Sequence, residues 1–252
     1  MGAPHTPLYL DWTFWAFVVA TLALLTSLYP ALKLLAKKGR IQVEVHDNIF
    51  LSHVVGTPCA QLYIIVRNIG GRRARITAIE LEFQRESGEE FLIPARGYFE
   101  NPGDKSPIMF TPFSLAPGQE WGHILNCYIL LPREEARGLA KLISNLRADI
   151  TAKRVGLPKE APDVPADDVN VTPLQDACER NFKWRPGEYR VTVITKGDAK
   201  FASTRTNSRI TIFESESTEL GRVADGYRTG KGILFGDRDW ILFQMTRGAD
   251  AH

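Results

Sequence analysis

The sequence has little of what enzymes and metal-binding proteins concentrate. Its 252 residues include five histidines and three cysteines, Cys59, Cys127 and Cys178, with no C-x-x-C pair and no Cys/His spacing suited to zinc. The H-E-x-x-H and G-x-S-x-G motifs of metalloproteases and hydrolases are also missing. We therefore expect no catalytic residue, no metal site and no cofactor.

The sequence also lacks an excess of one charge. It has 31 Lys and Arg against 29 Asp and Glu, a net charge of +2, whereas a dedicated nucleic-acid binder is usually clearly basic. Nucleic acid is therefore not an expected partner. An odd number of cysteines cannot be fully paired within one chain, and free thiols fit a reducing compartment such as the cytoplasm. One disulfide plus one buried thiol, outside the cytoplasm, remains the alternative.

The sequence does contain one long uncharged stretch. Trp12–Leu32 contains 21 consecutive residues without a charge, and a helix of that length spans about 30 Å, the thickness of the hydrocarbon core of a bilayer. A cleaved signal peptide would carry a basic N-terminal region, but residues 1–11 contain no Lys or Arg. The sequence predicts a short extramembrane segment (1–11) and a transmembrane helix (12–36). The expected anchor residues are Trp12, Trp15, Phe17, Leu24, Leu25 and Tyr29.

Basic residues follow the uncharged stretch and predict its orientation. They are Lys33, Lys37, Lys38 and Arg40, the last three within a juxtamembrane collar at 37–40. An excess of Lys and Arg marks the cytoplasmic side of a membrane helix. We therefore expect the N-terminus outside, the large C-terminal domain in the cytoplasm, and contact between these basic side chains and lipid headgroups. A periplasmic or extracellular domain is the alternative.

Residues 41–214 carry the signals of antiparallel β-structure. Ile41–His46 and Ala74–Phe83 alternate apolar and polar residues, the period of a half-buried strand. Glycine and proline turns separate such runs throughout this region. The alternation slips near Ala78–Ile79, which predicts a β-bulge or a strand break.

Two of these runs resemble bacterial immunoglobulin-like domains. "LYIIVRNIGGRRARITAIELEF" is similar to the opening pair of strands, and "RPGEYRVTV" resembles a late strand with the inward-facing Tyr189. The resemblance implies an antiparallel β-sandwich over 41–214, with a role in binding or spacing. The chain departs from antibody domains because it lacks their Cys…Trp…Cys arrangement.

An amphipathic helix interrupts the β pattern at residues 132–156. It places Leu139, Ile143, Leu146 and Ile150 on one stripe, which either covers an open part of the sandwich or docks a partner. The Pro- and Asp-rich residues 157–176 predict a loop. Residues 215–252 form a C-terminal extension in which two apolar runs fit a β-hairpin.

A second basic cluster, Arg72, Arg73 and Arg75, is expected on a turn, where it contacts phosphate or a partner or is simply solvated. The combined prediction is a single-pass, non-enzymatic binding or scaffold protein. Its partners would be the bilayer and a membrane protein or a second copy of the chain. Two alternatives remain: an envelope module with the same fold, and a hydrolase-type enzyme using scattered residues such as His123, Asp237 and Asp239.

Overall fold

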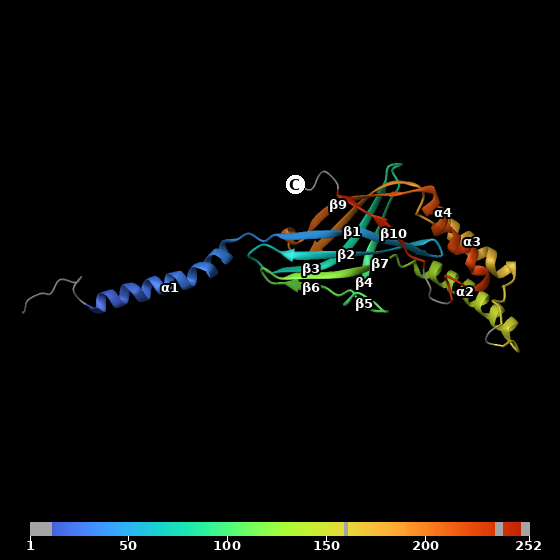
Figure 1. Ribbon diagram of the computed structural model, residues 1–252, viewed down its shortest axis with the longest axis horizontal. Helices are drawn as coiled ribbons and strands as arrows, with labels where there is room; N and C mark the ends of the chain where they lie inside the picture. The colour runs from blue at the N-terminus through green and yellow to red at the C-terminus, as the bar shows by residue number, and fades with distance from the viewer. Residues whose placement is uncertain (1–11, 159–160, 235–238, 248–252) are drawn as a thin grey trace, which may run out of the picture.

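The computed structural model describes residues 12–158, 161–234 and 239–247, without the side chains of residues 13, 31, 32 and 34–36. Across these ranges, one antiparallel sheet of 11 strands curves almost into a barrel. One helix extends from one end of the barrel, and three helices cover the opposite end (Figure 1). The prediction of a mainly antiparallel β fold is confirmed.

The strands are β1 (Ile41–Val54), β2 (Thr57–Asn68), β3 (Ala74–Arg85), β4 (Glu90–Phe99), β5 (Ile108–Met109), β6 (Phe113–Leu115), β7 (Glu120–Tyr128), β8 (Gly187–Gly197), β9 (Thr204–Ile212), β10 (Ile241–Gln244) and β11 (Thr246–Arg247). The α-helices are α1 (Trp12–Ala36), α2 (Arg133–Arg154), α3 (Asp168–Asn181) and α4 (Glu214–Arg222). Two short 3₁₀ segments are η2 (Lys200–Ala202) and η3 (Val223–Thr229).

The strand order is β10-β1-β2-β7-β4-β3-β8-β9-β11, with β5 paired to β4 and β6 to β3. A segment that we call the clasp, Ile241–Arg247, holds the two ends of this order together. Its first part pairs with β1 and its last part with β9. Between them, the Met245 amide donates to the Asp47 carbonyl at 2.7 Å. The clasp therefore nearly closes the sheet on itself.

The predicted immunoglobulin-like arrangement is not found. Such domains pack two separate sheets, whereas here the sheet is continuous, because β4 pairs with β3 along its first half and with β7 along its second. Alternation and Pro-Gly turns occur in sandwiches and barrels alike, so the sequence pattern could not separate the two. The predicted irregularity near Ala78 corresponds to a register shift between Ile76 and Ala78 where β3 pairs with β8.

The barrel interior is filled by the apolar face of each strand. Tyr189 and Val191 of β8 and Phe83 of β3 are fully buried. Trp184, which precedes β8, packs edge-on against the rings of Phe83 and Phe91 at centroid distances of 5.1 and 5.5 Å. Its indole N–H donates to the Ser52 carbonyl at 2.7 Å. Trp184 thus contacts strands on both sides of the barrel core.

A second core lies beneath the helices. Leu146 and Ile150 of α2 pack with Leu174 of α3 and Tyr227 of η3. We call α2, α3, α4 and η3 together the helical cap. It covers the end of the barrel opposite α1 (Figure 1).

The predicted loop at 157–176 is wrong over its second half, where α3 begins at Asp168. The prediction took its proline content as typical of a loop, yet Pro173 lies inside α3. Val171, Leu174 and Cys178 form a buried stripe at i, i+3 and i+7. Burial of this stripe outweighs the helix-breaking cost of one proline, which is about 3 kcal/mol.

The C-terminal extension also differs from the prediction. Its first part forms α4 and η3, and Ile233 and Leu234 pack against the cap without forming a strand. The second apolar run does form a strand, but β10 pairs with β1 rather than in a hairpin. Asp237 and the rest of 235–238 lie outside the described residues.

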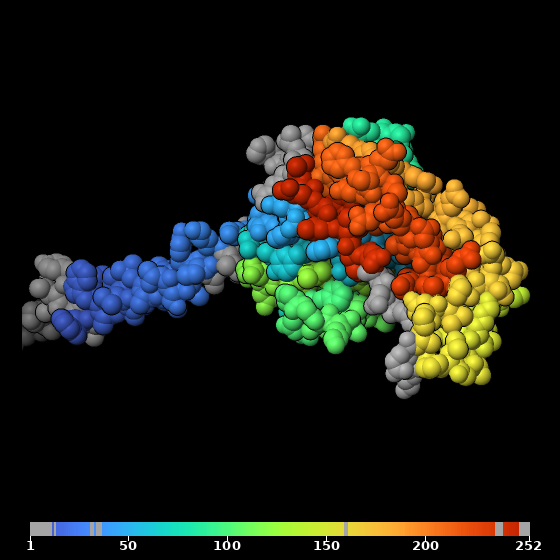
Figure 2. Space-filling view, turned by 45° about the vertical axis from the view of Figure 1, so that its right-hand side comes forward, coloured from blue at the N-terminus to red at the C-terminus, as the bar shows by residue number. Residues whose placement is uncertain are grey.

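Helix α1 stands apart from the barrel as a single rod (Figure 2). Most of its described apolar side chains are exposed, with Trp12 at 86%, Phe17 at 70% and Leu24 at 59% of full accessibility. Among the residues whose side chains are described, no helix combines the length and the hydropathy of a membrane span. The transmembrane helix over 12–36 therefore stays a prediction.

Candidate functional site

The end of the barrel next to α1 brings together two basic segments that are separate in the sequence. The backbone of collar 37–40 runs beside the turn between β2 and β3. The Ile69 and Gly70 amides both donate to the Arg40 carbonyl at 3.0 Å, and the Gly71 amide donates to the Lys38 carbonyl at 3.1 Å. The collar and the arginine-rich turn therefore form one surface.

The loop between β8 and β9 completes this surface. A Cβ atom on Gly39 would lie 2.4 Å from the ring of Phe201, so only glycine allows the collar to cross this ring without a shift. The Asp198 amide of the same loop donates to the Arg75 carbonyl at 3.3 Å. Lys200 is exposed beside Phe201 in η2.

We call the exposed basic side chains of these three segments the basic rim. They are Lys37, Lys38, Arg40, Arg72, Arg73, Arg75 and Lys200. Among the described residues, the ion pairs include none of them. Lys33, also predicted at this site, is exposed on α1, with its ammonium 6.0 Å from the centre of the Tyr29 ring. The exposed Asp198 is the acidic residue of these segments, so the rim carries a clear excess of positive charge.

Basic side chains on the barrel wall behave differently. Arg67 pairs with Glu44 at 2.9 Å and with Glu120 at 2.7 Å, and these carboxylates raise the pKa of the Arg67 guanidinium. Lys196 pairs with Glu80 at 2.7 Å. Several cations of the wall are thus paired with carboxylates, whereas no ion pair among the described residues includes a cation of the rim.

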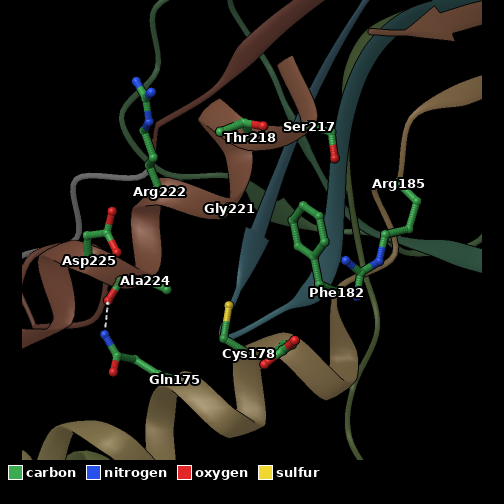
Figure 3. Close-up of a pocket in the computed structure, with 11 residues that line it drawn as sticks. Gln175, Cys178, Phe182, Arg185, Ser217, Thr218, Gly221, Arg222, Ala224 and Asp225 are labelled. Atoms are coloured by element: carbon green, nitrogen blue, oxygen red, sulfur yellow. Dashed lines mark hydrogen bonds between the residues drawn. The ribbon is translucent and has the colours of Figure 1, made fainter. Parts of the chain in front are cut away.

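The helical cap contains a cavity of about 500 Å³ (Figure 3). Phe182 and the Cys178 thiol point into it, while Arg185 and Arg222 lie toward opposite edges. The lining residues are Gln175, Cys178, Glu179, Phe182, Arg185, Ser217, Thr218, Gly221, Arg222, Ala224 and Asp225. The cavity therefore has an apolar floor and charged margins.

The nucleophile-type side chains of this cavity are held in structural roles. The Ser217 hydroxyl donates to the Trp184 carbonyl at 2.7 Å and ties α4 to the barrel. Burial raises the pKa of the Cys178 thiol, so the thiol stays protonated at neutral pH. Neither group is activated as a nucleophile.

His53 connects the cap to β1. It is buried, its Nδ1 accepts from the Gly56 amide at 3.0 Å, and its Nε2–H therefore donates to the Leu220 carbonyl of α4 at 2.8 Å. Burial lowers the pKa of the imidazole, so His53 is neutral at pH 7. Within the described ranges, no group of three or more His, Cys, Asp or Glu side chains could hold a metal ion.

The stripe predicted on α2 divides into two parts. Leu146 and Ile150 are buried in the cap core. Leu139 and Ile143 are only partly buried and line an apolar cavity of about 570 Å³ together with Tyr128 and other residues. Covering the barrel end accounts for the C-terminal half of the stripe, and the N-terminal half remains accessible.

The residues of the enzyme alternative do not converge among the described part of the chain. His123 lies in β7 with its ring 4.7 Å from Trp121 and 4.9 Å from Tyr98. Asp239 lines a cavity that His123 does not line. Sequence reasoning missed Phe201 and Lys200, because nothing in the loop at 197–203 signals a contact with residues near position 39.

Comparisons with protein-family models, with curated proteins and with solved structures found no match. Function must therefore be argued from the geometry of this chain. Its two distinctive regions are the basic rim beside α1 and the helical cap at the opposite end (Figure 1).

Proposed function

We propose that this protein is a membrane-anchored binding protein with no catalytic role, an accessory or scaffold subunit of a membrane complex. In this proposal α1 crosses the bilayer once and the barrel stands on its cytoplasmic side. The observation that carries the proposal is the exposure of Trp12, Phe17 and Leu24 on a helix that the barrel does not cover. Apolar surface costs about 25 cal/mol per Å² in water, and lipid would remove that cost.

The length of the helix supports a span rather than a shallow surface contact. The uncharged run in the sequence, Trp12–Leu32, extends beyond the side chains described in α1 and matches the bilayer core at about 1.5 Å per residue. An interfacial helix would carry a charged face, and this run has none.

The orientation rests on the collar. Lys37, Lys38 and Arg40 follow the run, and basic residues at one end of a membrane helix favour the cytoplasmic side. The cysteines say little about the orientation, because Cys59, Cys127 and Cys178 are all buried. A barrel outside the cytoplasm is therefore the second candidate.

The cap is the proposed partner-binding end, because it faces away from α1 (Figure 1). Its surface exposes Val155 at 78%, Val169 at 76% and, at the start of α4, Phe213 at 63%. Such side chains at the far end of an anchored domain would meet a membrane-protein partner or a second copy.

Charge insertion tests the anchor in the full chain. We expect Leu24→Arg/Leu25→Arg to release the protein from membranes under alkaline carbonate extraction, because each arginine costs about 2.5–3.5 kcal/mol at the centre of a membrane helix. Leu130→Arg/Leu157→Arg is the matched control, since both are exposed leucines outside α1, at 61% and 47%. Equal retention of both variants would refute the anchor.

Cysteine labelling tests the orientation. Because the native thiols are buried, the exposed Ser106 offers a selective site as Ser106→Cys. An impermeant maleimide should label this variant only after the cells are permeabilised. Labelling of intact cells would place the barrel outside and leave the anchor standing.

A further inference from the structure

We propose that the basic rim binds the phosphate headgroups of anionic phospholipids around the point where α1 enters the bilayer. This inference rests on the proposed anchor, and it assigns a ligand class to a surface that the fold assembles from three separate segments. The first argument is position. Collar 37–40, the β2–β3 turn and the β8–β9 loop meet where α1 joins the barrel, and α1 and β1 extend in roughly the same direction (Figure 1). A bilayer crossed by α1 would therefore face the rim.

The second argument is charge. The rim carries seven exposed cations from the three segments, and among the described residues no ion pair includes them. Four of the seven are arginines, whose planar guanidinium groups can each hold a phosphate with two hydrogen bonds. The potential of an anionic leaflet extends about a Debye length, roughly 8–10 Å, from its surface. Side chains at the barrel end beside the anchor lie within that reach.

The third argument is rigidity. Asn68 is buried, and its side-chain amide donates to the Arg72 carbonyl at 2.8 Å and to the Leu115 carbonyl at 2.9 Å. Its side-chain oxygen accepts from the Gly70 amide at 3.1 Å. The backbone that presents Arg72 and Arg73 is therefore fixed before any ligand arrives, which reduces the entropy lost on binding.

The same close packing joins the collar to this turn. A Cβ atom on Gly70 would lie 2.3 Å from the Arg40 amide nitrogen, so the two backbones touch. A Cβ atom on Gly39 would lie 2.4 Å from the Phe201 ring. The backbone segments that carry the cations of the rim thus form one closely packed surface.

The test is a lipid titration of the full chain in a non-ionic detergent. Short-chain phosphatidylglycerol is the anionic probe, and phosphatidylcholine of the same chain length is the neutral one. Native mass spectrometry counts the bound lipid. The rim variant is Arg72→Gln/Arg73→Gln/Arg75→Gln. The matched control, Arg133→Gln/Arg137→Gln/Lys141→Gln, removes the same charge from three exposed residues of α2.

We expect the wild-type chain to prefer phosphatidylglycerol and the rim variant to lose about tenfold or more in affinity for it, because each cation near an anionic surface contributes about fivefold. The α2 control should change by less than twofold, and salt at about 0.5 M should remove the preference. Thermal unfolding of each variant verifies that it is folded.

Three results would overturn the inference: equal binding of the two lipids, equal losses in the rim variant and the α2 control, or displacement of phosphatidylglycerol by an equal concentration of inorganic phosphate. The last would mark the rim as a site for free phosphate. The Leu24→Arg/Leu25→Arg variant in the same titration separates this inference from the anchor. A variant that is released from membranes but keeps its lipid preference would support both the anchor and the rim, whereas one that stays in membranes and keeps the preference would refute the anchor alone.

Discussion

The two ends of the barrel differ in where their polar groups find partners. At the cap, partners come from within the chain: His53 donates to the Leu220 carbonyl, and Ser217 donates to the Trp184 carbonyl. The Asp167 amide donates to the Asp149 carboxylate at 2.7 Å, and this bond, with others from Asn170 and Lys153, keeps the pKa of Asp149 below its usual value. Polar groups at this end attach helices to the sheet and to one another.

At the rim, the backbone is closely packed while the charged side chains are left exposed and uncompensated. A fold gains no stability from such side chains, because like charges repel one another. We infer that the negative charge that compensates these cations comes from outside the chain. The buried polar groups of the cap thus contribute to stability, and the exposed cations of the rim to contact with a ligand. Changes at the two ends should therefore be separable by experiment.

The largest loss of stability is expected at Trp184, which lies in the barrel core and whose carbonyl accepts from Ser217 of the cap. Trp184→Ala should lower the free energy of unfolding by about 3–5 kcal/mol, since a fully buried indole is replaced by a cavity. Urea unfolding followed by circular dichroism measures this change. Trp184→Phe, which keeps a ring but loses the N–H bonded to Ser52, should cost less. A loss below about 1 kcal/mol for the alanine variant would contradict this role.

A somewhat smaller loss of stability is expected within α2. This helix has a buried half and an accessible half, and the two halves should differ in their response to truncation. Leu146→Ala should cost about 2–5 kcal/mol, because Leu146 is fully buried. Leu139→Ala should cost clearly less, because Leu139 is only partly buried. Equal losses in urea unfolding would mean that α2 is uniformly part of the core and offers no accessible face.

At the rim, Gly39→Ala should cost about 1–3 kcal/mol by overpacking, because its Cβ would meet the Phe201 ring at 2.4 Å. Phe201→Ala in the same chain should recover much of that loss, since it removes the obstructing ring. A double-mutant cycle in urea measures the coupling. Additive losses would show that the collar does not rest on Phe201.

The smallest effect is a pH dependence at the cap. Burial lowers the pKa of His53 in the folded state below its ordinary value of 6.5, so the unfolded chain binds a proton more readily. The stability that the fold gains from neutral His53 is therefore fully present above pH 6.5. It is lost as the pH falls through the folded-state pKa, by at most about 1.4 kcal/mol per pH unit. Urea midpoints at pH 7.5 and 5.5 measure it. His53→Gln should remove this component, whereas His46→Gln, at an exposed site, should retain it.

Local patterns in the sequence predicted much of the secondary structure. Alternation over Ile41–His46 and Ala74–Phe83 corresponds to β1 and β3, and the stripe at 132–156 corresponds to α2. These patterns report which face of an element is buried. They do not report which strands pair, so they could not separate a sandwich from a nearly closed barrel.

The rest depended on contacts between distant residues. Pro173 is a helix breaker by local rules, and only the burial of Leu174 and Cys178 under η3 and α2 makes the helix there favourable. The rim likewise forms because backbones from 37–40, 69–73 and 197–203 meet. Sequence reasoning named Arg40 and Arg72 separately, but no local signal places them together.

The clasp affects the order in which the strands can pair while the chain is being synthesised. Asn48 of β1 pairs with Gln244 of β10, so the edge of the earliest strand must wait until almost all other strands have been synthesised. During translation this edge would be open to pairing with another chain. The ribosome, or a chaperone that occupies the same edge, would have to shield it until the clasp arrives.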